Sequence, residues 1–261
     1  MITDSEVIQL LNFDTTITTV SEVVAGLIDL YGVPTNTDEV YRIASSVLPV
    51  VLDQRARLAM RTTEVILQST SLTGAAVARP DFLPLPFIAK DISRAVGLTP
   101  DSINVSVSMI DPLSQELAKV SILPFTAPDS EEVVNKVIGR VSGSASHRAL
   151  NSQREVVKNT AYENTRKWAW RLTGRDNCIQ CLSRASRGVF FTKDGPFTGT
   201  HDNCKCYTEL VEDEENWNGK DTAEELATII KYNSERAGNS YKNADWAAIK
   251  KEFEMERTDI S

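Results

Sequence analysis

The feature that most constrains this sequence is the grouping of its cysteines. All four lie in one short stretch, as Cys178-x2-Cys181, then nineteen residues, then His201-x2-Cys204-x-Cys206. A Cys-x2-Cys pair lets two thiolates from one tight turn reach the same ion, and zinc prefers four thiolate or imidazole ligands in a tetrahedron. In a reducing compartment such clustering indicates metal binding before disulfides. The sequence therefore predicts one structural zinc ion in the C-terminal half.

Five candidate ligands compete for about four places at this ion. Cys178 and Cys181 are joined by two of His201, Cys204 and Cys206, and in an extended strand Cys204 and Cys206 would face the same side, which favours them over His201. A shell filled by protein ligands leaves no position for a catalytic water, so we interpret the site as structural. Two disulfides, or four thiols without metal, remain the alternative. A redox pair at Cys178 and Cys181 lacks the strand and helix context of that motif.

Composition narrows the function. The formal net charge is -8 and the sequence pI is about 5.0, which argues against a protein that wraps duplex DNA, because phosphate neutralisation needs a surplus of Lys and Arg. Apolar runs such as Val47 to Leu52 are far shorter than the roughly 20 residues of a membrane helix. The N-terminus is acidic and lacks the basic region of a secretory signal. We expect synthesis inside the cell and no membrane partner.

Two helices are predicted in the first part of the chain. The apolar spacing of residues 19–31 predicts a helix capped by Thr19 with Glu22 and ended by Gly32. A second helix should begin near Asn36 with Glu39 in its cap and run to Gln68. Pro49 lies inside it, so we expect a kink or a break there.

The middle of the chain alternates between breakers and a long helical pattern. Residues 74–86 carry one Gly and three Pro residues and predict a linker or elbow. Alternating apolar residues at 103–109 predict a short strand. A capping signal at Asp129 with Glu132 opens the longest helical stretch, which should reach Trp168 and Leu172. Gly143 and its neighbouring serines weaken the middle, so two helices in series remain possible.

The last part predicts a small mixed module and two further helices. Residues 189–193 and 206–210, separated by the turn signal at 194–196, suggest a β-hairpin or ribbon over the cysteine cluster. A helix follows from Asp221 through Tyr232, and a last short one begins near Ala244. The fold class is therefore mainly α, with long helices and a small C-terminal α+β module built around the Cys/His cluster.

We divide the chain into four regions. Residues 1–73 form a helical N-terminal region, and residues 74–128 form a linker and mixed segment. Residues 129–218 hold the long helix and the zinc-binding module, and residues 219–261 hold the C-terminal helices and a charged tail.

Five motifs stand in and around the cysteine cluster. They are Arg148-Ala149-Leu150-Asn151-Ser152-Gln153-Arg154, Trp170-Arg171-Leu172, Asn177-Cys178-Ile179-Gln180-Cys181, Ala185-Ser186-Arg187-Gly188-Val189 and His201-Asp202-Asn203-Cys204-Lys205-Cys206. With these motifs the segment from about residue 130 to 210 resembles the C-terminal domain of MuF-like minor capsid proteins of tailed phages, closest to the actinobacteriophage branch.

This resemblance implies a minor structural protein of the virion, present inside the head. Its partners would be the portal protein and the major capsid protein during procapsid assembly, with possible contact to packaged DNA. The protein would lie in the host cytoplasm during assembly and then in the interior of the virion head, and it would take part in DNA packaging or ejection. The resemblance implies no enzymatic activity for this segment.

Two rival functions rest on other residues. Ser144, Ser146 and His147 invite a capsid maturation protease, but three such residues on one helical stretch favour a polar helix face, since a triad needs partners from separate elements. Trp168 and Trp170, beside Arg166, Lys167 and Arg171, could form a zinc-stabilised nucleic-acid-binding patch. For that patch we favour Trp168 as core against the zinc module, with the cations on a solvated face.

Overall fold

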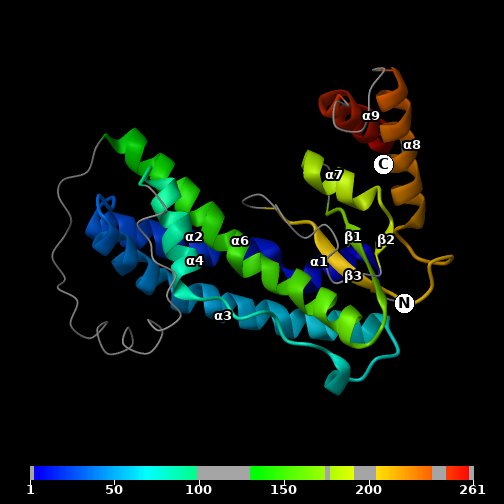
Figure 1. Cartoon of the computed structure of the whole chain (residues 1–261), viewed down its shortest axis with the longest axis horizontal. Coiled ribbons are helices and arrows are strands. Elements are labelled where there is room, and N and C mark those ends of the chain that lie inside the picture. The colour runs from blue at the N-terminus through cyan, green and yellow to red at the C-terminus, as the bar shows by residue number, and fades with distance from the viewer. Residues whose placement is uncertain (1–2, 99–129, 174–176, 191–203, 237–244, 259–261) are drawn as a thin grey trace.

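The molecule is mostly helical, with one small three-stranded sheet near its C-terminal end, which confirms the predicted fold class (Figure 1). The computed structural model describes residues 3–98, 130–173, 177–190, 204–236 and 245–258. The N-terminal helices are α1 (Asp4–Leu11), α2 (Phe13–Tyr31), α3 (Thr37–Ser69), the 3-10 turn η1 (Gly74–Ala76) and α4 (Leu85–Ala95). They are followed by α6 (Glu131–Glu163), β1 (Lys167–Arg171), α7 (Ile179–Ala185), β2 (Val189–Phe190), β3 (Tyr207–Val211), α8 (Lys220–Arg236) and α9 (Trp246–Thr258).

Helix α2 begins earlier than the sequence predicted, and Thr19 is not its cap. The chain is already helical from Asp4, and Asn12 divides α1 from α2. Asn12 adopts the left-handed conformation (φ 48°), and its side chain accepts a hydrogen bond from the Thr15 amide at 3.4 Å. Asparagine tolerates both roles because its short polar side chain bonds locally. The predicted end at Gly32 is confirmed, with φ 88°.

Helix α3 matches its predicted bounds. The Asn36 side chain accepts from the Glu39 amide at 3.0 Å, and the Glu39 carboxylate accepts from the Thr35 amide at 2.7 Å. The helix then continues unbroken to Ser69, so the break considered at Pro49 is wrong. Pro49 is exposed, and the packing of α3 against α2 and α6 offsets the lost backbone hydrogen bond.

The first core lies between α2, α3, α4 and the N-terminal half of α6. Small residues on α6 make this packing close, because Ser142, Gly143 and Ser146 are all buried. Helix α6 is a single element, so these residues do not divide it into two. The polar helix face expected at Ser146 is likewise wrong, since its side chain lies in the interior.

The segment predicted as a linker is only partly irregular. It includes η1, and α4 begins at Leu85, with Pro84 at its N-cap and Pro86 in its first turn. Proline is tolerated there because the first-turn amides have no partner within the helix. The predicted strand at 103–109 and the capping residue Asp129 lie outside the described residues.

The long helix ends nine residues before the predicted Leu172, and Trp168 lies in a strand. Asn164 closes α6, and Thr165 has φ 52°, which turns the chain into β1. The Arg166 amide donates to the Ala161 carbonyl at 2.7 Å in this turn. The helix prediction failed here because Trp168 lies seven residues after Ala161 and Leu172 lies four residues after Trp168, which is a helical spacing although the chain has already turned into a strand.

Strands β2 and β3 fall where the sequence predicted a ribbon, but they do not pair with each other. Both pair antiparallel with β1, which lies in the centre of the sheet in the order β2-β1-β3. Trp168 is opposite Phe190 on one side and Leu210 on the other. The turn at 194–196 lies outside the described residues.

A second core joins the sheet to α7, α8 and α9 and to the C-terminal ends of α3 and α6. The last helix begins near the predicted residue, and the Asp245 carboxylate there accepts from the Ala247 and Ala248 amides, each at 3.1 Å. Helix α8 begins at Lys220, so Asp221 lies in its first turn and not at its cap. Among the helices of the described residues, none combines the length and apolar character needed to span a bilayer.

Helices α3 and α6 are also linked by a buried ion pair. Arg55 is 4% exposed and donates to Glu155 at 2.5 Å and to the carbonyls of Arg148 and Asp81, each at 2.7 Å. Burial raises the pKa of the Glu155 carboxyl above 4.5, although Arg55 lowers it. A charged pair of this kind requires both partners, because either charge alone is costly to bury.

We therefore expect Arg55→Met to destabilise the protein by about 3–5 kcal/mol near neutral pH. Without Arg55 the pKa of Glu155 rises further. A carboxyl with a higher pKa in the folded than in the unfolded state disfavours folding increasingly as the pH rises above 4.5. The loss should therefore shrink as the pH falls towards 5, and urea unfolding at both pH values measures it. Arg140→Met, at an exposed position on α6, is the control, and equal losses in the two variants would contradict the prediction.

Candidate metal centre

The first two cysteines are placed by the start of α7. Cys178 is the N-cap residue of this helix, and its Sγ accepts a hydrogen bond from the Cys181 amide at 3.3 Å. Cys181 lies in the first turn and is buried, whereas Cys178 is partly exposed. The Cys-x2-Cys spacing thus works as a helix cap, in which a sulfur replaces the usual oxygen acceptor.

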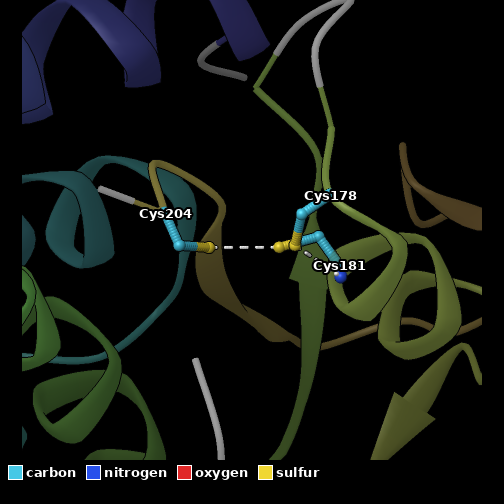
Figure 2. A group of neighbouring side chains, drawn as sticks. All are labelled: Cys178, Cys181 and Cys204. Carbon is cyan, nitrogen blue, oxygen red and sulfur yellow. Dashed lines mark hydrogen bonds between the residues drawn. The ribbon is translucent and has the colours of Figure 1, made fainter. Parts of the chain in front are cut away.

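The other two cysteines lie in the segment that leads into β3. Cys204 and Cys206 are 3% and 4% exposed, and both precede the strand, which begins at Tyr207. The Sγ atoms of Cys181 and Cys204 are 3.1 Å apart. Figure 2 shows the Cys204 side chain pointing across the gap towards Cys178 and Cys181. The three Sγ atoms all lie within 4.8 Å of one another, so these cysteines form a possible metal site.

Cys206 lies at the edge of this group. Its thiol interacts with those of Cys181 and Cys204, and it donates to the Asn177 side-chain oxygen at 3.5 Å. The structure therefore brings all four predicted cysteines to one place, with Cys178, Cys181 and Cys204 closest together. His201, the fifth candidate, lies outside the described residues.

None of the four cysteines forms a disulfide, and each thiol changes the pKa of its neighbours. Hydrogen bonds from the thiols of Cys178, Cys181 and Cys206, together with the charge of Arg154, hold the pKa of Cys204 well below its usual range. The hydrogen bond to Cys181 lowers the pKa of Cys206, but its bond to Cys204 and its burial outweigh this and raise the value to about 12. The thiol nearest to ionisation is thus Cys204. Metal ligation needs deprotonated thiols, so binding would release protons.

A buried arginine from α6 shapes the Cys204–Cys206 segment. Arg154 is 1% exposed, and its guanidinium donates to the Cys204 carbonyl at 2.6 Å and to the Cys206 carbonyl at 2.8 Å and 3.2 Å. Its remaining terminal nitrogen donates to the Asn151 side chain at 2.7 Å. The neighbouring Gln153 pairs with the backbone of Thr208 through both amide atoms, at 2.6 Å and 3.0 Å. Helix α6 therefore fixes the path of the chain from the cysteines into β3.

Trp168 and Trp170 are each 1% exposed and belong to the same core as the cysteines. The guanidinium of Arg154 lies 5.4 Å and that of Arg184 4.9 Å from the centre of the Trp170 ring. The preferred interpretation of Trp168 as core is confirmed, and these two indoles are not accessible to stack on bases. A positive charge over an indole face is itself stabilising.

The cations around these tryptophans face carboxylates. Arg166 and Lys167 form ion pairs with Glu212 and Glu214. Arg171 is 7% exposed and pairs with Glu209 at 2.7 Å and also with Asp4 of α1. The solvated face expected for Arg171 is therefore wrong, since this residue ties the N-terminal helix to the sheet.

The residues that suggested a protease do not form a nucleophile and base pair. The Ser146 hydroxyl is buried and has no hydrogen-bond partner among the described residues. His147 contacts the Asn151 amide at 3.2 Å, and Ser144 lines the same surface pocket as His147. Burial, helped by Arg154 and Arg148, lowers the pKa of His147 to about 4, so the ring is neutral near pH 7.

The sequence predicted the cysteines but missed Arg154 and Gln153 as part of the site. A signal for them exists, because the apolar pattern of α6 passes from Ala149 to Val157 with no apolar residue at 153 or 154. Both positions fall on the buried face of the helix. A polar residue on a buried helix face requires partners, which here are the backbone groups of the cysteine segment.

We expect Arg154→Met to destabilise the protein by about 2–5 kcal/mol, because two buried carbonyl groups each lose a charged donor. The loss should appear mainly in the C-terminal module. It would be seen as faster hydrogen exchange in residues 204–211 and in α7, with α2 and α3 less affected. Arg187→Met, at an exposed position just after α7, is the matched control. Equal exchange in the two variants would count against this role of Arg154.

Residues 110–229 of the chain match the model of a family described as VG15 protein. The matched span is somewhat less than half of the chain and includes α6, the sheet, all four cysteines and the first part of α8. Neither a curated protein nor a solved structure matches the chain significantly. In sequence, the four cysteines of the candidate metal site thus lie within the part that is similar to the VG15 family.

Proposed function

We propose that this chain is a minor structural protein of a tailed-phage head, whose C-terminal module is held together by one structural zinc ion. The observation that carries the proposal is the buried thiol group formed by Cys178, Cys181 and Cys204, with Cys206 beside it. This group lies in the segment whose motifs resemble MuF-like minor capsid proteins. The proposal joins that resemblance to a physical role for the cysteines.

The dimensions of the cluster suit zinc. A zinc ion binds thiolate sulfurs at about 2.3 Å, so in a tetrahedral site two sulfurs are separated by about 3.8 Å. The three Sγ atoms lie within 4.8 Å of one another, and Cys181 and Cys204 are 3.1 Å apart. A disulfide would require about 2.05 Å between them. Small adjustments of side-chain rotamers are enough to place these sulfurs around one ion.

A structural role fits the surroundings of the cluster better than a catalytic one. Four cysteine sulfurs fill a tetrahedral zinc shell and leave no position for a reacting water. Three of the four side chains are buried. Zinc in such a shell contributes folding free energy to a small module. The module needs this contribution because β2 has only two residues and α7 only seven.

The partners follow from the resemblance. We propose that the module contacts the portal protein and the major capsid protein inside the head, after synthesis in the host cytoplasm. The net charge of -8 and the pairing of Arg166 and Lys167 with carboxylates favour protein partners over duplex DNA. Contact with packaged DNA would then be secondary.

Metal analysis tests the zinc. Protein made under reducing conditions should contain about one zinc ion per chain. Cys178→Ser, Cys181→Ser and Cys204→Ser should each lose the metal and the folded C-terminal module, since the ion supplies folding free energy. Absence of metal in the unaltered protein would contradict the zinc assignment.

The fourth ligand is tested by a matched pair of variants. Because the Cys206 thiol contacts Cys181 and Cys204, we expect Cys206→Ser to lose zinc and His201→Ala to retain it. Measurement of zinc content and of zinc affinity by competition with a chelator distinguishes them. Retention in Cys206→Ser together with loss in His201→Ala would assign the fourth place to His201.

The virion role is tested by mass spectrometry of purified heads, before and after DNA release, from the phage that encodes the chain. The protein should be present in heads, and Cys178→Ser should reduce its incorporation relative to His201→Ala, because an unfolded module cannot dock. Absence of the unaltered protein from heads would overturn the proposed function while leaving the zinc assignment intact.

A further inference from the structure

An apolar stripe runs along the outer side of α3. It consists of the exposed residues Pro49, Leu52, Ala56, Met60 and Leu67 and of the half-buried Thr63, whose hydroxyl donates to the Ala59 carbonyl at 2.9 Å, and we call these six positions the α3 stripe. Leu52 is 39% exposed, Met60 71% and Leu67 41%. Exposed single apolar residues are common, but a continuous row of them on one helix indicates a contact surface.

The stripe follows from helical geometry. At 3.6 residues per turn the six positions fall within an arc of about 80°, and they extend over about 27 Å of helix. The opposite face of α3 is buried against the rest of the molecule through residues such as Val51, Leu58 and Val65. Helix α3 therefore has two apolar faces, and among the residues that the structure describes only one of them is buried in a core. In Figure 1, α3 runs below α6, and the segment that contains η1 passes below the C-terminal part of α3.

Charged residues line one flank of the stripe. Asp53, Arg57 and Glu64 all lie on the same side of it, by the same helical geometry. Arg57 pairs with Asp53 at 2.8 Å, with 60% and 49% of the two side chains exposed. Exposed pairs of this kind contribute little to stability, so Arg57 is available for a second carboxylate. Glu64 lies seven residues further on, out of reach of Arg57 in its own helix.

When two helices pack antiparallel, the same flank of each faces its counterpart. An antiparallel pair of α3 helices centred between residues 60 and 61 would place Arg57 opposite Glu64 of the second copy, twice by symmetry. The same register places Leu67 between the levels of Leu52 and Ala56 of the second copy, so the apolar side chains interdigitate. Charge and packing thus agree in one arrangement.

We propose that the α3 stripe is a self-association surface that binds the α3 stripe of a second copy of this chain, antiparallel and with twofold symmetry. None of the six stripe residues belongs to the core that contains the thiol group, to which α3 contributes Ile66 and, at its margin, Ala59. The surface therefore operates independently of the metal centre. A second copy fits this surface because Arg57 and Glu64 on its flank are opposite in charge and meet each other across the twofold axis in this pairing.

Analytical ultracentrifugation of the full chain over a wide range of concentrations tests the surface. The unaltered protein should form a dimer, and Met60→Glu should be monomeric. Its thermal unfolding curve should match that of the unaltered protein at concentrations low enough for the latter to be monomeric, because Met60 is mostly exposed and dimerisation itself adds stability. Leu30→Glu, at a position of α2 that is 58% exposed, is the matched control and should still dimerise.

Charge exchange tests the antiparallel register. Arg57→Glu alone and Glu64→Arg alone should each weaken dimerisation, since each puts like charges opposite one another. An equimolar mixture of the two variants should recover dimers, and so should the double variant, because opposite charges then meet at both ends.

Monomer at every concentration of the unaltered protein would overturn the proposal. Failure of the mixture to recover dimers would overturn the antiparallel pairing. If the unaltered protein stays monomeric while Met60→Glu abolishes incorporation into heads, the stripe instead binds another virion protein, and self-association is wrong.

Discussion

The guanidinium of Arg154 is the interaction on which the arrangement of the C-terminal half depends. This group is almost completely buried. Its charge is compensated by the carbonyls of Cys204 and Cys206, by the Asn151 side chain and by the nearby thiols. A buried cation is tolerated only with such a complete set of partners. The requirement works in both directions. The arginine needs the cysteine segment in one conformation, and that conformation directs the Cys204 sulfur towards Cys178 and Cys181.

The helix ends that are set by residues within one turn could be predicted from the sequence. Asn36 with Glu39 predicted the start of α3, and Gly32 predicted the end of α2, because caps involve residues within one turn. The Cys-x2-Cys motif was found for the same reason, since both sulfurs are set by the first turn of α7. Trp168 was misplaced because its strand is determined by pairing with Phe190 and Leu210, which are distant in sequence. Such contacts override the local period.

The contacts of Arg154 and Gln153 with the cysteine segment could not be predicted, because they too join residues that are distant in sequence. Arg154 and Cys204 are 50 positions apart, and their contact depends on the rotation of α6 about its own axis. That rotation is set by the packing of small residues such as Ser142 and Ser146 against other helices. The sequence showed that Gln153 and Arg154 interrupt an apolar pattern, but not which backbone groups would satisfy them. The sequence was therefore sufficient to predict the cysteines of the candidate site, but not that Arg154 and Gln153 would hold their segment in place.

Helix α6 takes part in both the N-terminal core and the core that contains the cysteines, and helix α1 connects the two as well. A third apolar cluster brings Val7 and Leu11 of α1 together with Leu58 of α3 and Tyr207 of β3. The ion pair between Asp4 and Arg171 lies at the other end of α1. Helix α1 thus contacts both α3 and the sheet and holds them together. The core of α2, α3 and α4 contains none of the cysteines, and its own apolar contacts stabilise it. Interactions among the cysteines therefore stabilise mainly the sheet and α7, which share a core with them.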